Sequence, residues 1–136
     1  MTRYVLDTSA VLAHFRKEQG WERVQTLAED PHAVLLLVSI SLTELARRLG
    51  ELGVPAKVAD DVVANYKAVF SEILPVDEAL ALAAVKIVRR SPGRLPLVDS
   101  LIAAAAHERH ACLVHRDRHF GAMPSDLISQ LDLATE

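Results

Sequence analysis

Four acidic residues stand at junctions between predicted strands and helices, and they are the residues of this sequence best suited to chemistry. Asp7 ends a short apolar run, Glu44 opens a helical pattern, Asp99 precedes an alanine-rich segment and Asp117 follows another apolar run. Several carboxylates held together repel one another, so such a group is costly unless a cation or a proton lies between them. Oxygen ligands without cysteine favour hard ions. The pattern therefore predicts a Mg²⁺ or Mn²⁺ centre suited to phosphodiester hydrolysis.

Two of these acids also have an ordinary interpretation as helix caps. An aspartate between a strand and a helix commonly accepts a hydrogen bond from the first helical turn, and both Asp7 and Asp99 occupy such a place. Thr8 and Ser9 can cap the first helix instead. We therefore expect the cap to pass to these neighbours and the Asp7 carboxylate to face a cleft.

The other two acids have local explanations as well. Ser41 and Glu44 have the spacing of a capping box, which is the stronger local interpretation of the glutamate. Asp117 lies between Arg116 and Arg118, where a solvated ion pair would account for it. Only the convergence of all four acids at one edge of a sheet favours a functional site.

Alternating strand and helix patterns predict how these acids are positioned. The predicted strands are 4–6, 33–38, 73–76 and 111–114, and the predicted helices are 8–17, 21–29, 42–52, 54–71, 78–90 and 100–108. Segment 33–38 is apolar on both faces, which is typical of a central parallel strand covered by helices. The predicted fold is α/β, with a mostly parallel central sheet and helices on both faces.

Two further features follow from the same patterns. Helices 42–52 and 54–71 follow one another without a strand, so they form a protruding hairpin whose apolar stripe must pack on the body or on a second subunit. Segment 126–133 has no clear strand or helix character.

Length and composition limit the class of protein. We expect the 136 residues to form a single domain, 1–136, because this length suits one core. No apolar run is long enough to cross a bilayer, which predicts a cytoplasmic protein without a membrane partner. The net charge of −3 argues against a dedicated nucleic-acid binder. Four carboxylates sequestered around cations would, however, leave the remaining surface slightly basic.

The order of the motifs resembles that of PIN-domain nucleases, and among them the VapC-like toxin ribonucleases of type II toxin–antitoxin systems. The resemblance covers nearly the whole chain. The matching motifs are Leu6-Asp7-Thr8-Ser9, Ser41-x-Thr43-Glu44-Leu45, Asp99-x-x-Ile102-Ala103-Ala104-x-Ala106 and Asp117-x-x-Phe120.

The resemblance implies a three-layer α/β/α fold and a metal-dependent endoribonuclease that cleaves RNA phosphodiester bonds. It implies a toxin that forms a homodimer and has a cognate antitoxin. Asp7, Glu44, Asp99 and Asp117 would hold one or two Mg²⁺ or Mn²⁺ ions. Residues placed to support the ligands or contact the substrate are Thr8, Ser9, Thr43, Arg94, His115 and His119.

Two histidines depart from the family pattern. His115 stands where such proteins usually carry Thr or Ser, and His119 stands where many carry another Asp. Imidazole suits Mn²⁺, Ni²⁺ or Zn²⁺ better than Mg²⁺, so these residues leave the metal preference open. An ordinary packing or surface role also explains each of them.

Other functions remain alternatives. One is a PIN-like nuclease that acts on DNA or on structured ends, and another is a non-catalytic acidic pocket that binds a partner. The basic residues ahead of Asp99 fit either a solvated helix end or a surface that guides a phosphate backbone. They are Lys86, Arg89, Arg90 and Arg94.

Overall fold

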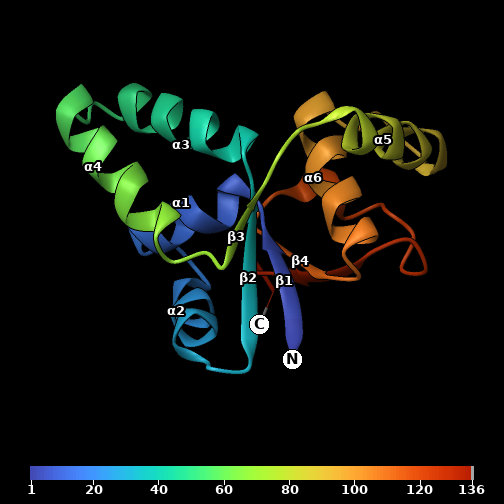
Figure 1. Ribbon diagram of the computed structural model, residues 1–136, viewed down its shortest axis with the longest axis horizontal. Coiled ribbons are helices and arrows are strands. Elements are labelled where there is room, and N and C mark those ends of the chain that lie inside the picture. Colours follow the sequence, from blue (N-terminus) through green and yellow to red (C-terminus); the bar gives the residue numbers. More distant parts are fainter. Residues whose placement is uncertain (136) are drawn as a thin grey trace.

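A five-stranded sheet forms the centre of the molecule, and every strand pairing in it is parallel (Figure 1). The computed structural model describes residues 1–135. The strands are β1 (Thr2–Leu6), β2 (Ala33–Val38), β3 (Glu72–Leu74), β4 (Cys112–His115) and β5 (Ser129–Asp132), in the order β3-β2-β1-β4-β5. The predicted α/β class is confirmed.

Helices cover both faces of the sheet. Figure 1 shows the sheet nearly edge-on, with α1 to α4 on one side and α5 and α6 on the other. The helices are α1 (Thr8–Arg16), α2 (Trp21–Glu29), α3 (Ile40–Glu51), α4 (Ala56–Lys67), α5 (Glu78–Arg90), α6 (Leu97–Glu108) and the short 3₁₀ helix η1 (Arg118–Phe120).

Strand residues alternate between two apolar cores because successive side chains point to opposite faces. Val5, Leu36 and Leu113 pack with α5 and α6, whereas Leu35 and Leu37 pack with the helices of the other layer. Both faces of the central strands are therefore buried, as the continuous apolar run 33–38 predicts.

The observed bounds of α2, β2 and α5 are those predicted, but α6 begins three residues earlier than expected. Pro96 is the cap residue of α6 and precedes Leu97, the first helical residue. Proline has a fixed φ and lacks an N–H, which fits the start of a helix. Asp99 consequently lies inside the first helical turn and is not its cap.

Helices α3 and α4 form the predicted protruding hairpin (Figure 1). Gly53, at φ 85°, follows α3 and allows the chain to reverse. Tyr66 of α4 packs edge-on against His14 of α1, and its hydroxyl lies 2.7 Å from His14 Nδ1. Helix α3 itself packs on α1 and β2, so both helices of the hairpin are attached to the body.

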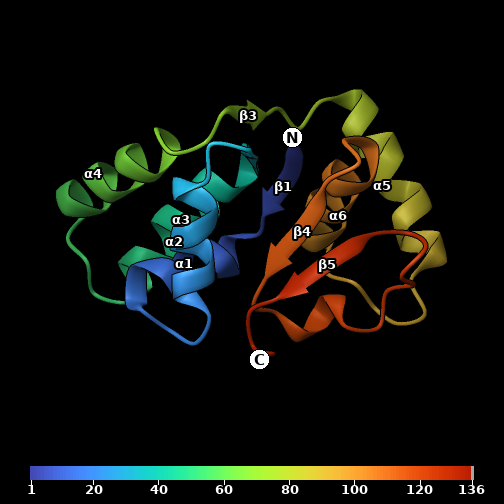
Figure 2. The same ribbon diagram turned by 90° about the horizontal axis from the view of Figure 1, so that it is seen from below.

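Segment 126–133, whose character the sequence leaves open, contains β5. This edge strand lies beside β4 (Figure 2). Beyond it, Leu133 is fully buried, its N–H donates to the His115 carbonyl, and its own carbonyl accepts from Arg23. The last strand is thereby attached both to β4 and to the start of α2.

Gly20→Ala should destabilise the fold more than Gly53→Ala. Both glycines have positive φ values, 90° and 85°, so alanine is strained at either position by about 1 kcal/mol. A Cβ at Gly20 would also lie 2.6 Å from the Leu133 carbonyl oxygen, while one at Gly53 meets no atom within 4 Å. Urea denaturation should show an additional loss of about 1–3 kcal/mol for Gly20→Ala. Equal losses would contradict the close packing of Leu133 on α2.

Candidate metal centre

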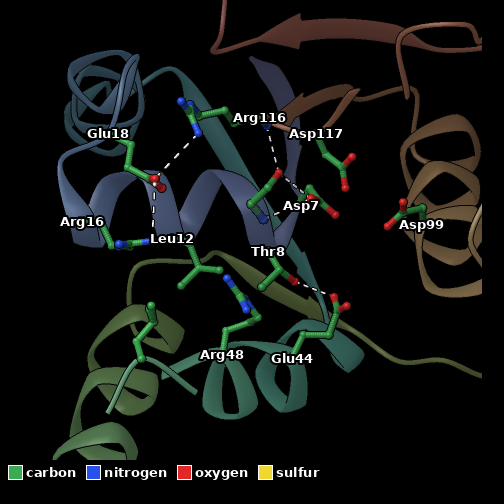
Figure 3. Close-up of a pocket in the computed structure, with 12 residues that line it drawn as sticks. Asp7, Thr8, Leu12, Arg16, Glu18, Glu44, Arg48, Asp99, Arg116 and Asp117 are labelled. Carbon is green, nitrogen blue, oxygen red and sulfur yellow. Dashed lines mark hydrogen bonds and ion pairs between the residues drawn. The ribbon is translucent and has the colours of Figure 1, made fainter. Parts of the chain in front are cut away.

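The four predicted acids line one pocket of about 300 Å³ at the carboxyl edge of the sheet (Figure 3). Asp7 and Asp117 come from the ends of β1 and β4, and Glu44 and Asp99 come from α3 and α6. In open α/β sheets this edge is where ligands bind.

Asp7 is fixed by the helix that follows it. Its Oδ2 accepts hydrogen bonds from the Ser9 N–H (3.0 Å) and the Ser9 hydroxyl (2.6 Å), so Asp7 itself is the cap of α1. The expectation that Thr8 or Ser9 replaces it as cap is wrong. Ser9 Oγ also accepts from the Arg116 N–H (2.9 Å), which joins the ends of β1 and β4.

Glu44 contacts α1 rather than its own helix terminus. Thr8 Oγ1 donates to Glu44 Oε1 at 2.7 Å. Helix α3 begins at Ile40, after Ser39, and the Ser41 hydroxyl is buried without a partner. The capping-box interpretation of Ser41 and Glu44 is therefore wrong, and Thr8 holds the glutamate toward the pocket.

Asp99 and Asp117 face each other across the pocket, with His119 beside them. Asp99 is only 8% exposed, and its Oδ2 accepts no hydrogen bond. Asp117 Oδ1 accepts from the His119 N–H and caps η1. His119 Nδ1 lies 2.9 Å from Asp117 Oδ1 and 3.3 Å from Asp99 Oδ2. Arg116 contacts Glu18 instead, so a pair with flanking arginines does not explain Asp117.

The remaining predicted residues lie in three different places. Thr8 and Ser9 line the pocket, whereas Thr43 and Arg94 are exposed and do not line it. His115 is fully buried. Its Nδ1 accepts from the Asp117 N–H, and its Nε2 lies 2.8 Å from Gln130 Oε1. His115 thus positions the backbone of Asp117 from below the pocket.

Burial and mutual repulsion alter the acidity of two of the acids. Burial raises the pKa of Asp7 to about 6, against the opposing effect of the Ser9 hydrogen bonds. Burial, followed by the charges of Asp7 and Asp117, raises the pKa of Asp99 to about 7, while His119 lowers it. Ionising the complete group at neutral pH is therefore costly without a cation.

A divalent cation fits these residues. The buried Asp99 Oδ2 lacks a hydrogen-bond donor, and a carboxylate in that state is stabilised by a cation. The donor set consists of carboxylate oxygens with one imidazole nitrogen close by, and it contains no thiolate. Such donors suit Mg²⁺ and Mn²⁺.

Arginines on the rim of the pocket were not anticipated from the sequence. Arg16, Arg48 and Arg116 line it together with Glu18, whose Oε2 lies 3.8 Å from Arg16 and 3.7 Å from Arg116 (Figure 3). They come from separate elements and form no motif in the sequence. The basic residues predicted near α5 do not line this pocket, and Arg90 among them pairs with Asp126 at 2.8 Å.

The acidic pocket, with arginines on its rim, lies at the edge of the sheet where open α/β folds bind their ligands. The PIN domain family matches residues 4–125, and the chain belongs to this family. PIN domain proteins are generally nucleases and typically use a divalent metal. The search of curated proteins found no match.

Solved structures share the whole fold. VapBC2 from Rickettsia felis, bound to a DNA fragment from its promoter, is 16% identical and aligns over 96% of this chain and 98% of its own, with a TM-score of 0.76. DNA-bound VapBC from Salmonella typhimurium is 22% identical over 98% and 99%, with a TM-score of 0.74. VapBC-1 from nontypeable Haemophilus influenzae is 18% identical over 98% and 100%, with a TM-score of 0.74.

Asp99→Asn should stabilise the metal-free protein at neutral pH. The carboxyl group has a pKa near 3.8 when unfolded and about 7 when folded, so the native state binds its proton more tightly and ionisation weakens folding as the pH rises. Urea denaturation in the presence of chelator measures the difference in unfolding free energy between the variant and the wild type. This difference should grow between about pH 4 and pH 7 to about 1–3 kcal/mol and then level off.

Asp126→Asn is the matched control, because its hydrogen bond with Arg90 lowers the pKa of this exposed carboxyl. It should not stabilise the protein at any pH. A stability difference for Asp99→Asn that does not change with pH would contradict the repulsion assigned to this pocket.

Proposed function

We propose that this protein is a metal-dependent endoribonuclease and the toxin of a toxin–antitoxin pair. The observation that carries the proposal is the convergence of four carboxylates from β1, α3, α6 and β4, one of which has a buried oxygen without a hydrogen bond. Asp7, Glu44, Asp99 and Asp117 would hold one or two Mg²⁺ or Mn²⁺ ions.

The residues of the chain have separate tasks in this reaction. When bound, divalent ions supply activation of water and neutralisation of charge on the phosphate. Ser9 fixes Asp7, and Thr8 fixes Glu44, so neither carboxylate has to reorganise when substrate binds. Arg16, Arg48 and Arg116 on the rim would bind phosphate groups of the backbone on either side of the cut bond.

RNA as substrate and an antitoxin as partner rest on similarity. The motifs resemble those of VapC-like ribonucleases, and the structures named above are of VapBC complexes, with a toxin–antitoxin complex from Klebsiella pneumoniae among the further matches. An antitoxin that blocks the pocket would explain how a cell tolerates the nuclease. A nuclease for DNA or structured ends, and a non-catalytic acidic pocket, remain the alternatives that experiment must exclude.

Cleavage of single-stranded RNA should depend on the four acids and on divalent metal. With Mg²⁺ or Mn²⁺, the wild type should cut RNA internally, and excess chelator should abolish the activity. Asp7→Asn and Asp99→Asn should each lower the rate by at least about 100-fold, since each removes a charged ligand. DNA of the same sequence should be cut far more slowly.

Asp77→Asn is the matched control for these variants. Asp77 caps α5 outside the acidic pocket, and asparagine caps a helix equally well, so cleavage should be unchanged. Undiminished cleavage in correctly folded Asp7→Asn and Asp99→Asn would overturn the four-acid site, and equal cleavage of DNA would favour the first alternative.

We also propose a homodimer, formed through the outer face of α5. Leu82, Val85 and Val88 are spaced three residues apart and are 60%, 39% and 48% exposed. Leu97, at the start of α6, is 75% exposed. The outer face of α5, with three exposed apolar residues along one side, is a better candidate than the α3–α4 hairpin, because Tyr66 of α4 already packs on α1 and Val58 is the one large apolar residue that α4 exposes.

Leu82→Glu should convert the dimer to a monomer, because it places a charge in an apolar interface. Size-exclusion chromatography with light scattering should give twice the chain mass of 14.9 kDa for the wild type and one chain mass for the variant. Val58→Glu, on an exposed site of α4, should leave the dimer intact. A monomeric wild type at high concentration would contradict the proposal.

A further inference from the structure

His119 adds a nitrogen donor to the acidic pocket. One ligand atom each from Asp99, Asp117 and His119 lie within 4.8 Å of one another, the only such group of three metal-binding side chains found among residues 1–135. Asp7 and Glu44 are engaged by hydroxyl groups, but Asp99 Oδ2 is buried and accepts no hydrogen bond. An oxygen in this state next to an imidazole points to a shared cation.

The separations match those of donors around one ion. Donor atoms bound at about 2.1 Å and at right angles to each other lie about 3.0 Å apart. His119 Nδ1 lies 2.9 Å from Asp117 Oδ1 and 3.3 Å from Asp99 Oδ2. These two carboxylate oxygens and the imidazole nitrogen can therefore meet one ion with little movement.

The backbone that carries His119 is held by buried residues. The His119 N–H donates to Asp117 Oδ1, and the next residue, Phe120, is fully buried with its ring 4.9 Å from that of His115. Gln130 contacts His115 Nε2 and donates to the Phe120 carbonyl. The His119 side chain is 48% exposed, so binding a metal requires no further burial of the ring.

We propose that His119 is a direct metal ligand through Nδ1, alongside Asp99 and Asp117, and that it makes the centre select Mn²⁺ over Mg²⁺. Mg²⁺ prefers oxygen donors, whereas imidazole is a good ligand for first-row transition metals. The inference rests on the proposed function, since both use the same divalent centre, but it concerns binding of the metal and not the cleavage of RNA.

Binding of metal alone tests it. Isothermal titration of the chelator-treated protein with Mn²⁺ and with Mg²⁺ should show that His119→Gln weakens Mn²⁺ binding by about 10- to 100-fold and changes Mg²⁺ binding much less. Electron spin-echo spectra of the Mn²⁺-loaded wild type should show modulation from a directly bound nitrogen, and His119→Gln should lose it. His119→Asp should restore affinity for both ions without the nitrogen signal. His32→Gln, an exposed histidine far along the chain, is the control and should match the wild type.

The opposite result has a clear signature. If His119 only neutralises the carboxylates, its removal eliminates a positive charge, and binding of both ions becomes stronger with no nitrogen signal in the wild type. That result would overturn the inference and leave the nuclease proposal standing, provided that cleavage remains dependent on metal. Binding of Mn²⁺ through His119 with no cleavage of RNA would overturn the proposed function and leave the inference standing.

Discussion

The repulsion among four carboxylates at one edge of the sheet is the constraint on which the local structure depends. Burial and mutual charge raise the pKa values of Asp7 and Asp99, so ionising these carboxyl groups without a bound cation costs free energy. The surrounding structure tolerates this cost because each carboxylate is held by a separate element. A rigid frame of this kind favours the binding of a cation, since the ligands cannot relax apart.

Hydrogen bonds between elements maintain that frame. Ser9 connects the ends of β1 and β4, and Thr8 connects α1 to α3. His115 supports Asp117 from the core, and Gln130 of β5 supports His115 in turn. Residues other than the four acids therefore determine how accurately the acids are placed, and the edge strand β5 acts on Asp117 through one residue, His115.

Much of this arrangement was predictable because it rests on local patterns. The apolar run 33–38 indicates the bounds of β2. The helix-breaking residues that flank α2 and α5 indicate the bounds of those two helices. The ordered motifs indicate the four acids. Other features depend on tertiary contacts that leave no signal in the local sequence. Glu44 has the spacing of a capping box but contacts Thr8. Segment 129–132 becomes the strand β5 by pairing with β4. The rim arginines come together from α1, α3 and the end of β4 in the same way.

The parallel pairing of β1 with β4 has a consequence for the order of folding. On one side β1 pairs with the nearby β2, but on the other side Tyr4 pairs with Cys112, a partner more than a hundred residues away. Contacts of such long range form slowly because closing the intervening loop costs chain entropy. A partly folded chain thus keeps Asp7 and Asp117 apart and has no centre to bind an ion. The four acids therefore line one pocket only after β4 has paired with β1, so the acidic centre is a property of the completed sheet and of no smaller part of the chain.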